Sequence, residues 1–338
     1  MKKIILAVFI LIIGLLHAEE KDKIFLGKTF VTGMMPVAVT VDSIENIYIA
    51  DRFTKSILKY DKNGKYLFSF GLKPKSKEDG GFYPVDLFYK DENIYVLDIS
   101  GRIVVFDEDG QVKSSKKYKT GNLLGEISGA KAIFVDDDYI YLADTGNNRI
   151  QILDRDGMVQ SGFGYKGALS GKLEQPEGVA VSRNEILVAD TGNNIVSIYE
   201  KNGIFKKNIS IDGEKLEEFK QPKSIIAGED GNIYILDSGS SKIKVFDSNY
   251  KFLYLLGSNK VNGNGKKRIE DIWLAGKKIY IADSLRKKIK VYDENMNFIR
   301  EVGRGSAAEI LIKAGLIALV IIVAFILLKK EKHFKGEI

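Results

Sequence analysis

The sequence predicts an all-β fold of six repeated four-stranded units, flanked by two apolar terminal segments. A short β-branched or aromatic run ending in Asp, such as IYIAD, occurs six times, and successive occurrences are 46 or 47 residues apart. Such a period is typical of arrays of small β-sheets. One long apolar run lies at each end of the 338-residue chain. The six marker aspartates are Asp51, Asp98, Asp144, Asp190, Asp237 and Asp283.

The N-terminal segment has the pattern of an export signal. Lys2 and Lys3 precede an apolar run over residues 4–16, and Ala18 follows it. A run of this length matches the apolar region of a signal peptide and is shorter than the ~20 residues that a spanning helix needs. Residues 1–18 are therefore predicted to be a signal peptide or an uncleaved N-terminal anchor. Either alternative exports the residues that follow.

The C-terminal segment predicts a membrane span. Residues 310–328 are apolar except for Lys313, and four lysines follow within residues 329–338. A helix of this length covers nearly ~30 Å, enough to cross a bilayer. We expect a linker and transmembrane helix over residues 305–328 and a basic cytoplasmic tail over 329–338. The repeats, within residues 19–304, would then face the periplasm or the extracellular side of a single-pass cytoplasmic membrane protein.

Each unit has the pattern of four short strands. In the first unit an apolar run, PVAVTV, comes about fourteen residues before the marker aspartate, and the marker run is the second strand. The third strand ends in a bulky residue and an acid, Tyr60-Asp61, and leads into the turn DKNGK. Asn-Gly is typical of two-residue hairpins. The fourth strand ends in Gly, as in YLFSFG.

These strands are apolar on both faces, so each small sheet must be covered on both sides. A radial stack of sheets achieves this, because each sheet lies between two neighbours, and a closed ring leaves only short edges. The pattern therefore predicts a six-bladed β-propeller. Residues 23–33, KIFLGKTFVTG, have strand character and are expected to help seal the first blade to the last.

Three stretches resemble the signature of NHL repeats: ADTGNNRIQILD (143–154), QPEGVAV (175–181) and ADTGNNIVSIYE (189–200). The resemblance covers about 270 residues and implies an NHL-type propeller. It does not choose a function, because NHL propellers serve as binding platforms, RNA-binding modules and enzymes. The chain also departs from the pattern: the position of Arg149 is occupied in other units by Ser56, Ile195, Lys242 and Lys288.

The marker aspartates could be metal ligands, but they recur once per unit and are therefore spread around the ring. We expect them to accept hydrogen bonds from the adjoining turn backbone instead. The acidic turns DEDG and DRDG and the run at 136–138 lack the full spacing of a calcium loop. They are interpreted as solvated hairpins, and no metal or cofactor is predicted.

The residues available for catalysis are few. The chain has no Cys, and its only histidines are His17 and His333, outside the repeats. Many enzymatic six-bladed propellers use His as base or ligand, whereas gluconolactonase-like ones hold a divalent metal with carboxylates and amides. The alternative function is therefore a metal-dependent hydrolase or lactonase at the channel mouth. The candidate channel residues are Asp86, Lys131, Glu177, Lys223, Glu270 and Asp271.

The net charge of +6 is modest, but cations are predicted to cluster on one face of the ring. Loops between second and third strands and links between units share this face, called the top face. The candidate binding residues on it are Arg52, Lys55, Lys266, Lys267, Arg268, Arg286, Lys287 and Lys288. The sequence thus predicts a noncatalytic binding or scaffolding propeller that engages a protein or an anionic envelope polymer or lipid. Export disfavours nucleic acid, and the oligomeric state is not predicted.

Overall fold

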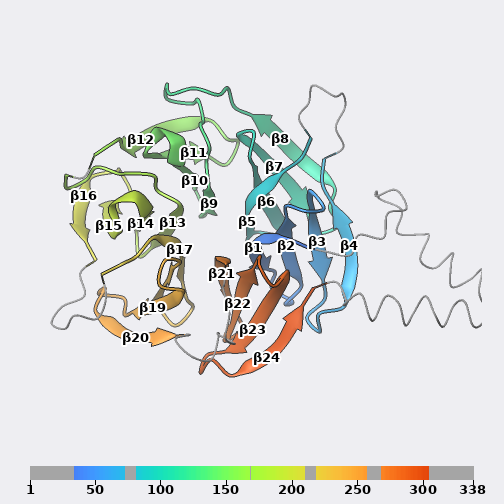
Figure 1. The fold of residues 1–338 in the computed structure, drawn as a ribbon. Coiled ribbons are helices and arrows are strands. Elements are labelled where there is room, and N and C mark those ends of the chain that lie inside the picture. The colour runs from blue at the N-terminus through green and yellow to red at the C-terminus, as the bar shows by residue number, and fades with distance from the viewer. Residues whose placement is uncertain (1–33, 73–80, 168, 210–217, 257–267, 304–338) are drawn as a thin grey trace, which may run out of the picture. The chain divides into compact units, whose positions relative to one another are not determined.

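The computed structural model of the chain describes residues 34–72, 81–167, 169–209, 218–256 and 268–303 (Figure 1). The chain divides into two compact units, and all described residues belong to the unit Gly33–Gly303. The predicted signal segment, the predicted membrane span and the proposed sealing segment 23–33 lie outside the described residues. Within the described part, no helix is long and apolar enough to cross a membrane.

The described residues form six antiparallel sheets of four strands each. Blade 1 consists of β1 (Pro36–Val41), β2 (Ile47–Asp51), β3 (Ser56–Tyr60) and β4 (Tyr66–Phe70). Blade 2 consists of β5 (Pro84–Lys90), β6 (Asn93–Asp98), β7 (Arg102–Asp107) and β8 (Val112–Lys117). Blade 3 consists of β9 (Ala132–Val135), β10 (Tyr139–Asp144), β11 (Arg149–Asp154) and β12 (Val159–Gly164). Blade 4 consists of β13 (Gly178–Ser182), β14 (Glu185–Asp190), β15 (Ile195–Glu200) and β16 (Phe205–Asn208). Blade 5 consists of β17 (Pro222–Ala227), β18 (Ile233–Asp237), β19 (Lys242–Phe246) and β20 (Phe252–Leu256). Blade 6 consists of β21 (Ile269–Ala275), β22 (Lys278–Asp283), β23 (Lys288–Asp293) and β24 (Phe298–Val302).

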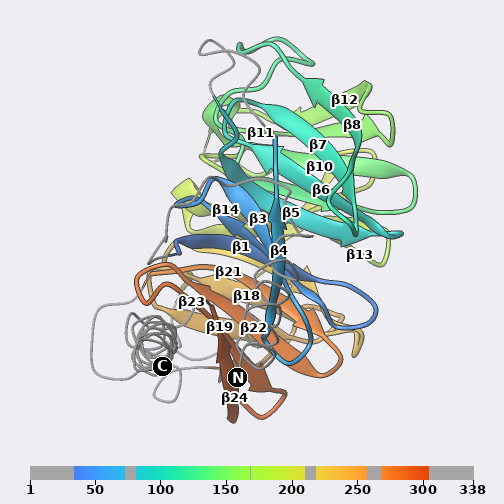
Figure 2. The same cartoon turned by 90° about the vertical axis from the view of Figure 1, so that its right-hand side faces the viewer.

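The six sheets surround a central axis as the blades of a propeller, which confirms the predicted architecture (Figure 1). The first strand of each blade lies nearest the axis and the fourth lies at the periphery. Because consecutive strands are antiparallel, loops between second and third strands and links between blades emerge at the top face (Figure 2). The remaining two turns of each blade emerge at the opposite face, called the bottom face.

The core lies between adjoining blades, as the doubly apolar strands predict. Each of the six interfaces holds its own cluster of buried apolar side chains. Within β2, Ile47 and Ile49 pack toward blade 6, whereas Tyr48 and Ala50 pack toward blade 2. Alternate residues of one strand therefore serve two different interfaces, as the two-residue period of a strand requires.

Among the described residues, every sheet consists of four strands that are consecutive in the chain, so blades 6 and 1 share none of the described strands. Their interface is held by apolar packing and by polar contacts between residues far apart in sequence. The carboxylate of Asp271 accepts a hydrogen bond from Val39 N at 3.0 Å, and Lys278 Nζ lies 2.7 Å from Glu45 Oε1. This interface is called the seam.

The marker aspartates are structural, as expected. In blades 1 to 5 the carboxylate accepts a hydrogen bond, 2.6 to 2.8 Å long, from a backbone amide in the link that precedes its blade. The donors are the amides of Met35, Tyr83, Ser128, Glu174 and Lys220. In blade 6 the described donor is Arg286 N, within the loop that follows Asp283. Each buried carboxylate thus fastens the top-face loops of its blade.

Candidate functional site

A cavity of about 230 Å³ lies on the axis of the ring and is lined by the first strands of all six blades. It opens among charged side chains, and the sequence-predicted channel residues Asp86, Lys131, Glu177, Lys223, Glu270 and Asp271 all line it. Two of the predicted top-face cations, Arg52 and Arg268, line it as well. Concave cavities with a few convergent polar groups are the usual locations for small ligands in proteins.

The order of residues along the first strands places the lining in layers. Lys131, Glu177, Lys223 and Glu270 come one residue before the positions of Asp86 and Asp271, nearer the top face. In blades 1, 2, 5 and 6 the residue at this position (Val37, Val85, Lys223 and Glu270) falls where the register of the first strand shifts. A shift of this kind re-aims side chains at sheet edges. A charged rim of Lys131, Glu177, Lys223 and Glu270 therefore lies above an acidic layer of Asp86 and Asp271.

Aromatic side chains line the cavity further toward the bottom face, although their shared position in the first strands predicts a role in the core. The rings of Phe88 and Phe134 lie 4.7 Å apart between centroids, and those of Phe88 and Trp273 lie 5.1 Å apart. All three occupy the same position in their first strands, two residues after the position of Asp86. That shared position was a readable signal for an aromatic floor.

Asp86 and Asp271 each bond to the inner strand of the next blade. Asp86 Oδ2 accepts from Ile133 N at 2.8 Å, and Asp271 Oδ2 accepts from Val39 N. Asp271 Oδ1 also accepts from Ser224 Oγ at 2.7 Å. Inner strands are sheet edges with unpaired amides, so these carboxylates satisfy donors that would otherwise lie unpaired in the channel wall.

Both carboxyl groups hold protons more tightly than usual. Burial raises the pKa of Asp271 to about 6. Burial also raises the pKa of Asp86 well above its ordinary value, and the nearby charge of Asp271 raises it further. Removing these groups from water disfavours the charged form, and like charges add to that cost. The acidic layer is therefore less negative near neutral pH than two free carboxylates would be.

Ion pairs neutralise part of the rim. Lys223 Nζ donates to Glu270 Oε2, while Arg268 Nε lies 2.8 Å and Ser284 Oγ 2.9 Å from Glu270 Oε1. Burial alone would raise the pKa of Glu270, but the charge and hydrogen bond of Lys223 hold it below its ordinary value. Three of the four cavity carboxylates are thus engaged by their own neighbours. Among the described residues, no group of three or more His, Asp or Glu side chains could hold a metal ion.

The top-face cations fall into two classes. Three have acidic partners: Arg268 pairs with Glu270, Arg286 Nη1 lies 2.9 Å from Asp283, and Lys288 Nζ lies 3.7 Å from Glu301. The other three, Arg52, Lys55 and Lys287, form no ion pair with any described residue. Lys55 Nζ donates to Tyr83 Oη at 2.5 Å. Lys266 and Lys267 lie outside the described residues.

Comparison with known proteins supports the fold. Residues 170–257 match a family model described as a 6-bladed beta-propeller. This stretch includes all strands of blades 4 and 5. No curated protein sequence matches the chain.

Solved structures with the same fold include two lyases. Virginiamycin B lyase from Staphylococcus aureus, solved as a catalytically inactive variant with quinupristin, shares 15% identity and a TM-score of 0.57; the match covers 81% of this chain and 86% of that chain. A streptogramin B lyase shares 14% identity and a TM-score of 0.58, covering 82% of this chain and 86% of that one. At such identities the likeness shows the fold alone. Sheet topology, family model and solved structures agree that the chain is a six-bladed β-propeller.

Proposed function

We propose that the chain is a noncatalytic binding propeller, displayed on the outer side of the cytoplasmic membrane, whose top face engages a protein or an anionic envelope component. The observation that carries the proposal is the contrast between the two charged regions. Three of the four cavity carboxylates are engaged by backbone amides and ion pairs, whereas Lys55 and Lys287 on the top face are exposed and form no ion pair with a described residue. Charge that is unpaired at a surface is available to a partner of opposite sign.

The absence of His from residues 18–332 supports a noncatalytic role, because the usual neutral-pH base is missing from the propeller. The apolar run at 310–328 and the lysines after it support membrane display with the ring outside. The stretches ADTGNNRIQILD and QPEGVAV support an NHL-type assignment of the blades. Residues 1–18 serve as the export signal in this proposal.

The test compares the two faces of the ring in membranes of the source cells. A photo-crosslinking residue replaces Lys287 on the top face or, as the matched control, Asn63 in the bottom-face turn between β3 and β4. We expect the probe at position 287 to give a discrete crosslinked species and the probe at position 63 to give none. Equal crosslinking at both positions, or crosslinking at position 63 alone, would show that the working face is wrongly assigned.

Two further measurements test the other parts of the proposal. Protease added outside spheroplasts should digest the propeller and leave a C-terminal fragment protected; full protection of the propeller contradicts outward display. Metal analysis of the purified chain should find no stoichiometric divalent ion. A stoichiometric metal lost on substitution of Glu177 or Glu270 would favour the hydrolase alternative at the channel mouth.

A further inference from the structure

The loops between second and third strands differ systematically around the ring. In blades 3, 4 and 5 the second residue after the marker aspartate is glycine, whereas blades 6 and 1 have Leu285 and Phe53 there. In blade 2, whose loop is shorter, Ile99 follows the marker directly. These apolar side chains are 51%, 55% and 56% exposed. The three glycines are Gly146, Gly192 and Gly239.

A packing difference accounts for this division. A Cβ on Gly146, Gly192 or Gly239 would lie 2.6, 2.6 or 1.9 Å from a carbonyl oxygen of the link that covers the loop. Glycine is therefore required where the loop is covered by the link. In blades 6 and 1 the side chain at this position is instead largely exposed at the top face, and in blade 2 the residue one position earlier, Ile99, is exposed as well. Isolated exposed apolar residues are common, but one in the same loop of each of three consecutive blades forms a pattern.

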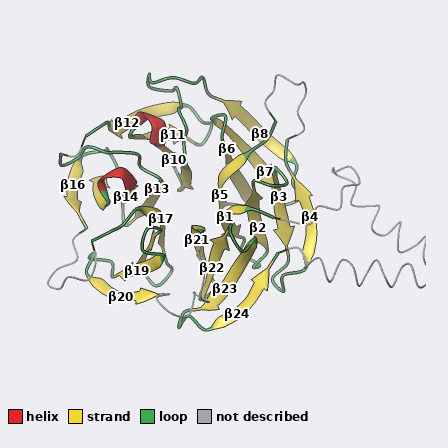
Figure 3. Ribbon diagram, viewed as in Figure 1, coloured by secondary structure: helices red, strands yellow, loops and turns green. Residues whose placement is uncertain are grey.

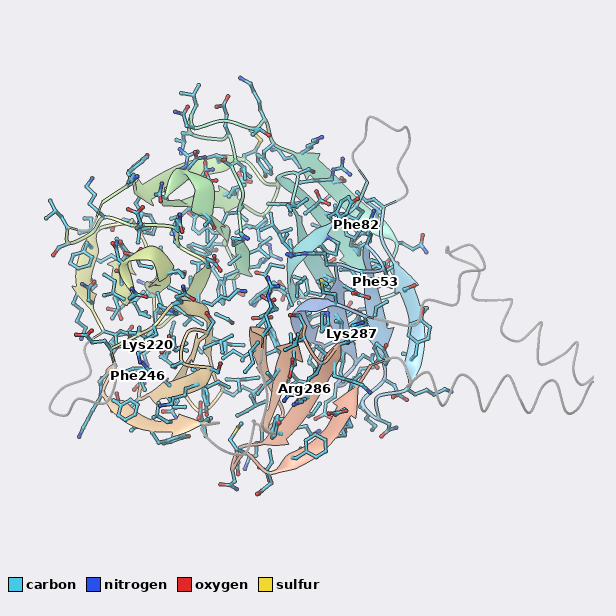
Figure 4. All side chains as sticks on the ribbon, viewed as in Figure 1. Phe53, Phe82, Lys220, Phe246, Arg286 and Lys287 are labelled. Atoms are coloured by element: carbon cyan, nitrogen blue, oxygen red, sulfur yellow. The ribbon has the colours of Figure 1, made fainter. Side chains whose placement is uncertain are left out.

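The three apolar residues share their sector of the ring with the unpaired cations. Blade 1 packs against blade 6 on one side and blade 2 on the other. Arg52 and Lys55 belong to the same loop as Phe53, and Lys287 belongs to the same loop as Leu285. Figure 4 shows Phe53, Arg286 and Lys287 in adjoining sectors of blades 1 and 6. The 6–1–2 arc is defined as Leu285, Phe53, Ile99, Arg52, Lys55 and Lys287.

The chain leaves the propeller beside this arc. A Cβ on Gly303, the last described residue, would lie 3.3 Å from Lys287 O. From Gly303 to the apolar run that begins at Ile310 is about seven residues, which reach at most ~25 Å when extended. Any anchor formed by that run therefore keeps Gly303, and the end of the 6–1–2 arc at Lys287, within that reach of the membrane surface.

We infer that the 6–1–2 arc docks on the surface of an anionic bilayer. Its apolar side chains enter the interfacial zone, and its three unpaired cations face lipid phosphates. The inference rests on the proposed membrane display and adds the occupant of the top face. Basic side chains around exposed apolar ones are the combination that binds anionic bilayer surfaces, because headgroup attraction and apolar burial act together. A polymer without an apolar layer would leave Leu285, Phe53 and Ile99 in water.

The test uses the full chain in lipid nanodiscs. Because the chain contains no Cys, single substitutions give single labelling sites. Leu285→Cys, Phe53→Cys and Ile99→Cys each carry a polarity-sensitive fluorophore, and the discs contain lipids with a quencher near the headgroup. Two exposed positions serve as controls: Leu169→Cys, 79% exposed on the link before blade 4, and Ile204→Cys, 60% exposed on the bottom-face turn of that blade.

In discs with phosphatidylglycerol we expect the three arc probes to be quenched at least threefold more than both controls. Raising the salt, or using neutral phosphatidylcholine discs, should reduce this difference, because electrostatic attraction to the surface is screened or removed. The triple variant Arg52→Gln/Lys55→Gln/Lys287→Gln should reduce it in the same way. Equal quenching at arc and control positions in anionic discs would overturn the inference and leave the arc to a protein partner.

Co-elution of the chain with the discs separates this inference from the proposed function. A chain that stays in the discs with unquenched arc probes retains the anchor and loses the lipid contact. A chain that does not enter the discs contradicts membrane display, and the labelled protein is then mixed with preformed anionic vesicles. Arc-specific quenching by those vesicles would support lipid docking without the anchor, and its absence would overturn it.

Discussion

The loops between the second and third strands of blades 3 and 4 have nearly the same sequence. The buried marker aspartate of blade 3 has a cationic partner, however, and that of blade 4 has none among the described residues. Both loops form a short 3₁₀ turn, η2 (Thr145–Asn147) and η3 (Thr191–Asn193), which are the two helical turns in Figure 3. Both turns end at an asparagine in the left-handed region, Asn148 with φ 55° and Asn194 with φ 57°. The backbone geometry of the signature is thus the same in both blades.

The residues after the turn make the difference. In blade 3 the fully buried Arg149 lies 2.9 Å from Asp144 Oδ2 and donates to the carbonyls of Asn122, Leu123 and Glu126. In blade 4 the corresponding residue is Ile195, so no such cation reaches Asp190. Burial accordingly raises the pKa of Asp190 to about 6.

The comparison shows that the signature depends on backbone donors to the aspartate, while the cation is optional. Asp190 still accepts from Glu174 N at 2.7 Å and from Asn193 Nδ2 at 2.8 Å. Blades 5 and 6 supply a cation from other positions: Lys244 lies 3.0 Å from Asp237, and Lys290 lies 3.6 Å from Asp283, which also pairs with Arg286 at 2.9 Å. Both lysines come two residues after the position of Arg149. The loop keeps its conformation whichever cation pairs with the aspartate, because its hydrogen bonds do not depend on one cation.

Making blade 3 like blade 4 should have the largest effect. Arg149→Ile leaves Asp144 buried without its cation and removes one donor from each of three carbonyls, of which Leu123 O and Glu126 O keep a second donor. We expect a loss of about 3–5 kcal/mol in the free energy of unfolding, mostly from the uncompensated buried charge. Urea titration at pH 7 measures it. Adding Asp144→Asn should restore part of the loss, because the uncompensated charge is then removed. A loss below about 1 kcal/mol would show that the ion pair is dispensable in blade 3 as well.

The raised pKa of Asp190 predicts a pH dependence specific to blade 4. Between its ordinary pKa of 3.8 and about 6, the folded state binds more protons at this site than the unfolded state. Its contribution to stability therefore falls as pH rises through that window and is constant above it. After allowance for solvent screening we expect a change of about 1–2 kcal/mol. Urea titrations at pH 4 and pH 7 measure the free energy of unfolding of the wild type and of Asp190→Asn. The stability of the wild type relative to the variant should be lower at pH 7 than at pH 4.

Placing the cation of blade 3 at the matching position of blade 4 should increase the free energy of unfolding by a smaller amount. Ile195→Arg with Ser197→Gln reproduces the pair Arg149 and Gln151, and we expect about 1 kcal/mol of added stability at pH 7. The pH dependence assigned to Asp190 should weaken in the same variant. Ile195→Lys is the control, because a lysine lacks the planar fork that engages a carboxylate and carbonyls together. A destabilised arginine variant would mean that the blade 4 loop cannot accommodate the guanidinium.

The smallest effects should be equal in the two blades. Asn148 Oδ1 accepts from Gln175 N, and Asn194 Oδ1 accepts from Gln221 N, both at 2.9 Å. Glycine keeps the left-handed conformation and removes only this exposed hydrogen bond, so Asn148→Gly and Asn194→Gly should each cost about 0.5 kcal/mol. Matched urea titrations of the two variants test this. Losses that differ by more than about 1 kcal/mol would show that the two loops are not energetically equivalent.

The repeat could be predicted from sequence because its signals are local. The marker aspartate, the hairpin turns and the doubly apolar strands recur within each unit, and the structure places them as expected. The replacement of Arg149 by Lys244 or Lys290 could not be predicted by alignment of one position. The replacement depends on a lysine side chain two residues further along the third strand that is long enough to reach the aspartate at the end of the second strand.

The candidate site was harder to predict, because its contacts cross between blades. The charged lining followed from the position of each residue in its first strand, but the bonds of Asp86 to blade 3 and of Asp271 to blade 1 depend on ring geometry. The apolar residues of the 6–1–2 arc were readable only by comparing loops at matching positions, where glycine is absent from three consecutive blades.

The seam has a kinetic consequence. Its described polar contacts join residues 232 to 238 positions apart, and none of the described strands is shared across it. Contacts of such separation carry the largest loop-closure entropy, so they form after the blades that they connect. Interactions made that late are absent from the folding transition state and act on the rate of opening rather than the rate of assembly. We therefore expect substitutions at the interface between blades 6 and 1 to change the lifetime of the closed ring more than its rate of formation.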